Sequence, residues 1–168
     1  MTLLPPPGFA SSGSMAGKTV LIVRCPVEPP TLYASSEHSP HAFPQTGANS
    51  GLGFATANSL AEMGAKVVLA VRDPAKGNAA AAKIKGSVEV SQLDLGDLGS
   101  VKAFAKRWGD RPVDVLMLNA GVMAIPERSL TKDGFERHYA VNHLGHFALT
   151  VTLSLTVTLS LTVTQVGI

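Results

Sequence analysis

Three glycines between positions 46 and 53 constrain this chain more than any other feature. The segment reads Thr-Gly-Ala-Asn-Ser-Gly-Leu-Gly and opens an Ala-rich stretch with helical spacing of its apolar residues. Gly47 can form a tight turn with positive φ, Gly51 lets the backbone approach a ligand, and Gly53 lets the helix pack closely. The start of that helix offers unpaired backbone N–H groups and a partial positive charge. The spacing therefore predicts a site for the pyrophosphate of a dinucleotide.

Short apolar, β-branched runs alternate with helix-prone segments along most of the chain. Strands are expected at 18–23, 66–71, 88–93 and 113–118, and helices at 52–63, 75–84 and 100–108. Apolar runs of this kind suit strands that are buried on both faces of a parallel sheet. The alternation predicts an α/β fold with βαβ units.

Residues 24–45 interrupt this alternation. They carry five prolines and show neither helical nor strand periodicity. They also separate the first expected strand from the glycine turn, although a phosphate-binding turn needs its strand to lead directly into it. One interpretation is a surface insertion. We favour the other, in which 24–45 is foreign sequence such as a translated intron.

Both ends of the chain are compositionally simple. Residues 1–16 are rich in Pro, Ser and Gly, which predicts a disordered leader rather than a secretory signal or transit peptide. Residues 151–168 repeat the hexapeptide Val-Thr-Leu-Ser-Leu-Thr, and the alternation of apolar residues predicts a one-sided strand rather than a helix. Without charge or proline, this low-complexity tail is also prone to aggregate. A functional repeat, such as an adhesion element, is the alternative.

Composition narrows the class of partner. Charged residues make up 15% of the chain and the net charge is +2, without basic clusters, so no nucleic-acid surface is expected. The single cysteine, Cys25, excludes an intrachain disulfide, and the five histidines lack the spacing of zinc ligands. No uninterrupted apolar run is long enough to span a membrane. We expect a small-molecule partner and no secretion, with cytoplasm and plastid both open as the compartment.

Four motifs then follow in order: the glycine turn, Leu93-Asp94-Leu95, Asn119-Ala120-Gly121, and a run from Tyr139 to Phe147 that reads Tyr-Ala-Val-Asn-His-Leu-Gly-His-Phe. Together they resemble the short-chain dehydrogenases/reductases over residues 17–150, apart from the insertion. Residues 131–147 are most similar to the retinol dehydrogenase-like and related plastid branch, which handles apolar alcohols or carbonyls with NADP(H). The resemblance implies a Rossmann-like doubly wound parallel sheet, represented by its N-terminal half only, with strands one to four in the order 3-2-1-4.

The resemblance also implies cofactor-binding residues. The pyrophosphate turn would comprise Gly47, Asn49, Ser50, Gly51, Leu52 and Gly53. Asp94 would hydrogen-bond the adenine with the Leu95 backbone beside it. The fourth strand would be supported by Asn119, Ala120 and Gly121, which would also pack near the adenosine ribose. The alternatives are that Asp94 only caps the following helix and that 119–121 form only a turn.

Asn142 matches the family's catalytic asparagine, which holds a water in the proton relay. The alternative is an ordinary amide in the interior of a helix. The family also uses a tyrosine as acid beside the nicotinamide, a lysine four residues later that lowers its pKa, and a serine that orients the substrate. The two tyrosines of this chain, Tyr33 and Tyr139, are not followed by such a lysine.

Arg72 bears on the choice of cofactor because it lies 19 residues beyond Gly53, at the end of the second expected strand. An acidic side chain there would hold the ribose 2′-hydroxyl of NAD, whereas an arginine would pair with the 2′-phosphate of NADP. Asp73 could serve the hydroxyl, but its place before Pro74 favours helix capping. NADP(H) is therefore expected over NAD(H).

The sequence thus predicts the NADP(H)-binding part of an oxidoreductase that is catalytically incomplete as written. The alternatives are a non-catalytic nucleotide-binding or interaction module and a gene-model fragment without function. A sheet that ends at strand four would expose the edge of that strand, and such edges pair with other chains. Self-association through this edge is therefore expected.

Overall fold

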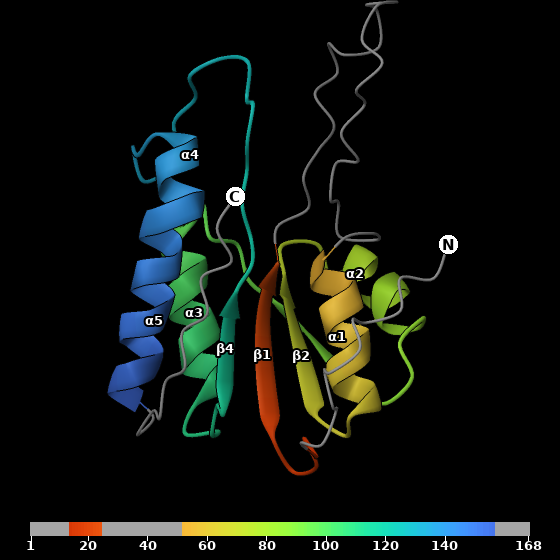
Figure 1. The fold of residues 1–168 in the computed structure, drawn as a ribbon. Helices are drawn as coiled ribbons and strands as arrows, with labels where there is room; N and C mark the ends of the chain where they lie inside the picture. The colour runs from red at the N-terminus through yellow and green to blue at the C-terminus, as the bar shows by residue number, and fades with distance from the viewer. Residues whose placement is uncertain (1–13, 25–51, 157–168) are drawn as a thin grey trace, which may run out of the picture.

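Four parallel strands form the centre of the molecule (Figure 1). The computed structural model describes residues 14–24 and 52–156, and in it the strands lie in the order β3, β2, β1, β4. The strands are β1 (Thr19–Arg24), β2 (Lys66–Val71), β3 (Ser87–Gln92) and β4 (Val115–Leu118). Both the α/β class and the expected strand order 3-2-1-4 are confirmed.

Helices cover both faces of this sheet, as expected of a doubly wound fold. In Figure 1, α1 and α2 lie to one side of the strands and α3 and α5 to the other. The helices are α1 (Leu52–Glu62), α2 (Pro74–Ala81), α3 (Leu98–Trp108), α4 (Arg137–Tyr139) and α5 (Gly145–Thr156), and a π-helical turn, η2 (Ala140–Leu144), joins α4 to α5. None of the helices in the described part of the chain is both long and apolar enough to span a membrane.

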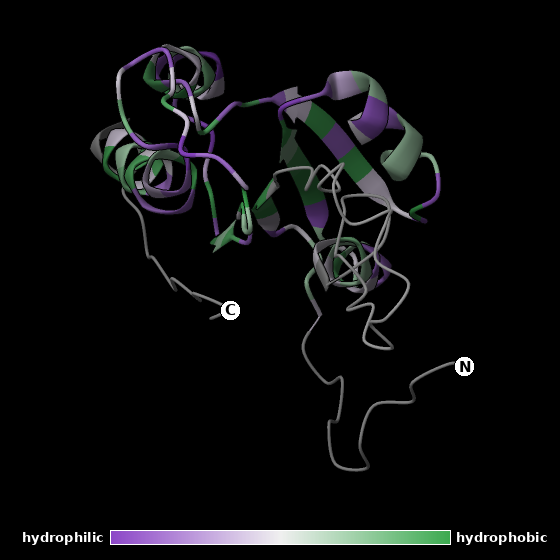
Figure 2. Cartoon of the chain, turned by 90° about the horizontal axis from the view of Figure 1, so that it is seen from above, coloured by the Kyte–Doolittle hydropathy of each residue, from purple (hydrophilic) through white to green (hydrophobic). Residues whose placement is uncertain are grey.

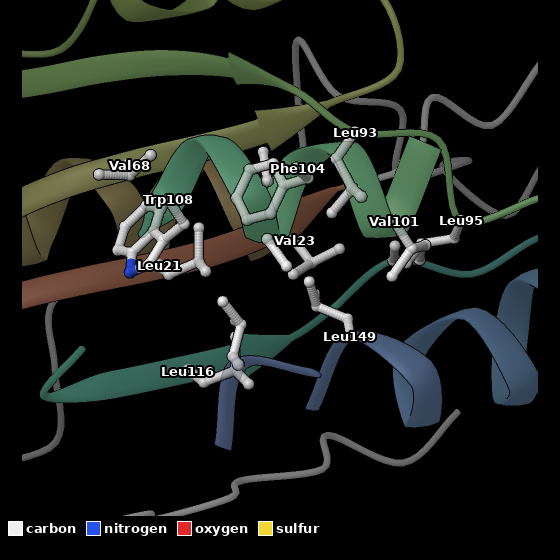
Figure 3. Packing of buried hydrophobic residues seen from close by; sticks show 14 of the residues in the cluster. Leu21, Val23, Val68, Leu93, Leu95, Val101, Phe104, Trp108, Leu116 and Leu149 are labelled. Atoms are coloured by element: carbon white, nitrogen blue, oxygen red, sulfur yellow. The ribbon is translucent and has the colours of Figure 1, made fainter. Parts of the chain in front are cut away.

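The central strands are buried on both faces because successive side chains point to opposite sides of a strand. Leu21 of β1 belongs to a cluster that includes Phe104 of α3 and Leu149 of α5 (Figure 3). The next residue, Ile22, belongs to a second cluster on the other face with Ala57 of α1. Figure 2, which looks down on the molecule, shows hydrophobic colour along the strands between the helices. The two-sided apolar runs of the sequence therefore form the core.

The start of α2 follows the predicted capping signal. Asp73 is the N-cap, and its Oδ1 accepts hydrogen bonds from the backbone N–H groups of Ala75 at 2.9 Å and Lys76 at 3.3 Å. Pro74 occupies the first helical position, where no backbone donor is needed. The expectation that Asp73 caps the helix is confirmed, and Arg72 is left as the cation directly after β2.

The first copy of the hexapeptide repeat, residues 151–156, is helical, so the predicted strand is wrong there. These residues continue α5, in which Leu149 and Leu153 lie one turn apart and are both fully buried. The Thr152 hydroxyl donates to the carbonyl of Ala148 at 2.6 Å, as hydroxyls in helices do. Burial of the two leucines against the sheet outweighs the local alternation. The rest of the tail, 157–168, lies outside the described residues.

Candidate functional site

The predicted site residues that the structure describes gather at one end of the sheet, where the strands have their carboxyl ends. Parallel strands end at the same edge, and the arrowheads of β1, β2 and β4 point to it in Figure 1. Arg72 directly follows β2, Asn119 directly follows β4, and Asp94 comes two residues after β3. Open α/β sheets bind ligands in the crevice outside the carboxyl ends of their strands. The carboxyl edge of the sheet, meaning the end at which the strands finish, is therefore the candidate site.

Gly53 and Asn119 meet at this edge. Gly53 lies in the first turn of α1, and a β-carbon placed on it would lie 2.7 Å from Nδ2 of Asn119. A larger residue at this position would therefore require the Asn119 amide to shift. Leu52 is the first residue of α1. The other predicted members of the turn lie outside the described residues: Gly47, Asn49, Ser50 and Gly51.

Asn142 lies in the π-helical turn and is bonded to the segment that follows β4. Its Oδ1 accepts from the backbone N–H of Val122 at 2.7 Å, and its Nδ2 donates to the Val122 carbonyl at 2.8 Å. Gly121 lies beside this pair, since a β-carbon there would be 3.6 Å from the Asn142 Oδ1. Residues 119–122 thus connect α1 with η2, and Asn142 is more than an unattached helix amide.

Asp94 shapes the turn between β3 and α3. Its Oδ1 accepts from the N–H of Gly96 at 2.9 Å, and its own N–H donates to the Ser100 hydroxyl at 3.0 Å. The residue that caps α3 is Asp97, whose Oδ1 accepts from the N–H of Ser100 at 3.0 Å. The alternative in which Asp94 is the helix cap is therefore wrong.

A contact between Leu95 and Gly145 escaped the sequence analysis. A β-carbon on Gly145 would clash with the Leu95 carbonyl oxygen and lie 2.9 Å from the Leu95 Cβ. Gly145 begins α5 directly after η2, so its lack of a side chain lets this helix reach the turn after β3. A glycine inside a helical pattern can signal close backbone approach, and Gly145 was the sequence signal that could have revealed this contact.

The loop before α4 is also held at this edge, by two contacts with the start of α3. Lys132 Nζ lies 2.7 Å from Asp97 Oδ2, and Asp133 Oδ2 accepts from the N–H of Leu98 at 2.9 Å. The hydrogen bond from Lys132 is the largest influence that lowers the pKa of Asp97. The motif from Thr131 onward thus ties the α4 end of the molecule to β3 and α3.

Glu136 caps the short helix α4. Its Oε1 accepts from the N–H of His138 at 2.9 Å, and its Oε2 accepts from the N–H of Tyr139 at 2.8 Å. These backbone bonds, with help from the His138 ring, lower the pKa of Glu136 from 4.5 to about 2. The carboxylate therefore fixes the point at which the chain enters the π-helical turn.

A metal site would place further requirements on the described side chains. Within 14–24 and 52–156, no group of three or more His, Cys, Asp or Glu side chains is placed to hold a metal ion. Arg72 and Asn119 are half-buried, whereas Ala120 is buried. The carboxyl end of the sheet therefore offers glycine-lined backbone, amide side chains and the Arg72 cation, a set that suits an anionic nucleotide rather than a metal.

Known proteins share this arrangement. A family model described as short chain dehydrogenase matches residues 45–158. Retinol dehydrogenase 12 of Mus musculus is 49% identical over 115 residues, covering 64% of this chain and 36% of the relative. A probable oxidoreductase of Streptomyces lividans is 46% identical over 112 residues, covering 64% and 37%. The chain thus spans little more than a third of the length of these relatives.

Solved structures give the same result. An uncharacterized protein from Mycobacterium paratuberculosis aligns with a TM-score of 0.67 and 46% identity, covering 86% of this chain and 44% of that one. A metagenomic short-chain oxidoreductase in complex with NADP aligns with a TM-score of 0.60 and 25% identity, covering 86% and 58%. With its strand order, its glycine at the start of α1 and a family match over more than half of its length, this chain belongs to the short-chain dehydrogenase family.

Proposed function

We propose that this chain is the NADP(H)-binding part of an oxidoreductase that acts on apolar alcohols or carbonyls. The observation that carries the proposal is the close approach of Gly53 to Asn119, since a β-carbon would lie 2.7 Å from the amide. It holds the start of α1 against the end of β4, where a dinucleotide phosphate is favoured by the helix N-terminus. The retinol dehydrogenase relatives support the substrate class, and the NADP-bound neighbour supports the cofactor.

Each residue at the carboxyl edge is assigned to one part of the cofactor. Arg72 pairs with the 2′-phosphate, and Asp94 with the Leu95 backbone binds the adenine. Asn119, Ala120 and Gly121 support the adenosine ribose, and Gly53 lets the phosphates approach the helix. Asn142 is the catalytic residue of this set. The bound nicotinamide supplies or accepts the hydride.

A comparison of two cofactors tests the assignment of Arg72. Replacing Arg72→Ala removes a charge-assisted hydrogen bond, so NADPH affinity is expected to fall about tenfold to a hundredfold while NADH affinity changes little. The matched control is Lys85→Ala, which removes an exposed positive charge just before β3, at the opposite edge. Isothermal titration gives both affinities. Equal losses for the two cofactors, or no NADPH binding by the unaltered chain, would refute the proposal.

We further propose that the chain as written binds cofactor without turning it over. Tyr139 is half-exposed, and its ring lies 5.4 Å from that of His143, the fourth residue after it, so Tyr139 does not match the family's Tyr-x-x-x-Lys pair. A positively charged lysine beside a tyrosine lowers the pKa of that tyrosine, and neither Tyr33 nor Tyr139 is followed by one at that spacing. NADPH oxidation with retinal as the trial substrate is expected to stay at the background rate. Steady turnover would contradict the proposal.

The leader and the insertion are proposed to lie outside the ancestral domain, whereas the family match up to residue 158 and the helical residues 151–156 support counting the start of the tail within it. The start of the family match at residue 45 supports a foreign origin of 24–45, because it coincides with the end of that segment. Sequencing of the mature transcript tests this proposal. A transcript that retains all 22 codons, together with tight cofactor binding by the protein, would contradict it.

The second candidate is an interaction module that self-associates through β4. Among the residues described, β4 pairs with β1 alone, and Met117 on it is half-buried. A charge on an edge strand opposes pairing between chains, so Met117→Lys is expected to shift the chain toward monomer in sedimentation velocity. Met63→Lys, at an exposed methionine beyond α1, is the control. Association that survives Met117→Lys unchanged would exclude this edge.

A further inference from the structure

His146 is a polar side chain buried in the interior next to the candidate site. It lies in the first turn of α5 and is 8% exposed. Its Nδ1 is 3.2 Å from the backbone carbonyl of Asn142, whereas its Nε2 is buried and has no hydrogen-bond partner among the residues that the structure describes. Among the described residues, one ring nitrogen thus has a hydrogen-bond partner and the other has none.

The partner of Nδ1 determines the state of the ring. A backbone carbonyl only accepts hydrogen bonds, so Nδ1 of His146 must carry the hydrogen, and in the neutral ring Nε2 is then a bare acceptor. Burial lowers the pKa of His146, although the bond to Asn142 opposes this, and the neutral form is therefore favoured. A buried Nε2–H would lack an acceptor, which gives a second reason for the Nδ1–H tautomer.

The carbonyl that His146 binds belongs to the π-helical turn. The N–H of Gly145 donates to the carbonyl of Ala140, five residues back, instead of the usual four. Such wide turns displace the regular ladder of hydrogen bonds, and side chains can then satisfy the carbonyls. Here the side chain of residue 146 serves the carbonyl of Asn142, while the amide of the same Asn142 is bonded to Val122.

We propose that His146 is a positioning residue that holds the backbone of Asn142 through its Nδ1–H and thereby keeps the Asn142 amide on Val122. The asparagine is thus held at its main chain by the imidazole and at its side chain by the Val122 backbone. The inference rests on the proposed function only where it assigns Asn142 to the reaction.

The state of the ring can be measured directly in the unaltered chain. Long-range nitrogen–proton NMR spectra of the imidazole are expected to show His146 with a hydrogen on Nδ1 and none on Nε2. His143, which is exposed one turn earlier, serves as the internal reference. The Nε2–H tautomer would overturn the proposal, whether or not the chain binds NADPH.

Two substitutions of His146 then distinguish the role of Nδ1 from that of Nε2. The amide of His146→Asn places a donor near the position of Nδ1, whereas that of His146→Gln reaches toward the position of Nε2. We expect His146→Gln to speed hydrogen exchange of the Val122 N–H roughly fivefold to tenfold and His146→Asn to restore slow exchange. The N–H of Leu69, in the central strand β2, reports global opening.

Local and global effects have different signatures in this experiment. Faster exchange at Val122 with unchanged exchange at Leu69 supports a positioning role. Equal acceleration at both amides would reduce His146 to a structural residue and overturn the proposal, as would unchanged Val122 exchange in His146→Gln. NADPH titration of the same variants is scored separately, so failure of cofactor binding counts against the proposed function and leaves the exchange result intact.

Discussion

The side-chain amide of Asn142 pairs with the backbone of Val122 in both directions, accepting its N–H at 2.7 Å and donating to its carbonyl at 2.8 Å. This geometry imitates the paired bonds between two strands. It satisfies a backbone donor and acceptor in the segment directly after β4, where the sheet has ended. A single side chain thereby ties the π-helical turn to the sheet.

Replacing Asn142→Leu is expected to destabilise the chain by about 1–3 kcal/mol, because both Val122 groups lose partners in a partly buried place. Urea unfolding followed by circular dichroism measures the change. Asn58→Ala is the control, because this amide donates an exposed hydrogen bond of 2.9 Å to Glu62 on α1. The control should lose at most about 0.5 kcal/mol. Equal losses in the two variants would contradict the assigned role of the pair.

Gly53→Ala is expected to cost about 0.5–1 kcal/mol of stability and to weaken NADPH binding, since the added carbon would lie 2.7 Å from the Asn119 amide and push that side chain aside. Removing that amide as well, in Gly53→Ala with Asn119→Ala, should recover part of the stability. Thermal unfolding of both single variants and the double variant completes the cycle. Additive losses would mean that the two residues do not share this contact.

Leu153→Ala is expected to destabilise the fold by about 2–5 kcal/mol, although the residue belongs to the hexapeptide repeat. Its side chain is fully buried on α5, whereas Val151 in the same repeat is 41% exposed. Val151→Ala should therefore change stability by no more than about 0.5 kcal/mol. Urea midpoints of the two variants make the comparison, and a small loss for Leu153→Ala would show that the repeat is not part of the core.

Acid is expected to remove the stabilisation given by Glu136. The folded-state pKa is lowered from 4.5 to about 2, so the unfolded chain takes up the proton first as the pH falls. The contribution of this group is complete above pH 4.5 and disappears as the pH approaches 2. Between pH 6 and pH 3, the urea midpoint should fall less in Glu136→Gln than in the unaltered chain. Glu127→Gln, at an exposed glutamate, should follow the unaltered chain.

The parts of the fold that sequence predicted well are those in which local and tertiary preferences agree. β2 was expected at 66–71 and has those bounds, because an apolar run that is buried on both faces is also a strong strand former. The start of α2 was predictable because Asp73 and Pro74 signal it chemically. The candidate residues at the carboxyl ends of the strands were expected mainly from the resemblance to the short-chain dehydrogenases/reductases, and the strand order brings those after β2, β3 and β4 to the same end of the sheet.

The sequence-based predictions fail where contacts between residues far apart in the sequence determine the local structure. The repeat alternates with period two, yet Leu149 and Leu153 are buried together on α5, and that packing selects the helix. The π-helical turn has no sequence periodicity of its own, and its Asn142 is bonded to Val122, which lies 20 residues away in the sequence. Gly145 looked like an ordinary helix position because its neighbour, Leu95, is 50 residues away in the sequence.

β1 lies between β2 and β4 and is the only described strand that touches both. It is also the strand that 27 residues separate from α1, the next described element. A single protease cut between Arg24 and Leu52 would therefore turn the middle of the sheet into a separate peptide. The pairing of β1 with β2 and β4, which is intramolecular in the intact chain, would become binding between two molecules and would weaken on dilution. Nicked protein would then lose its structure according to its concentration, and added peptide 14–24 would restore it.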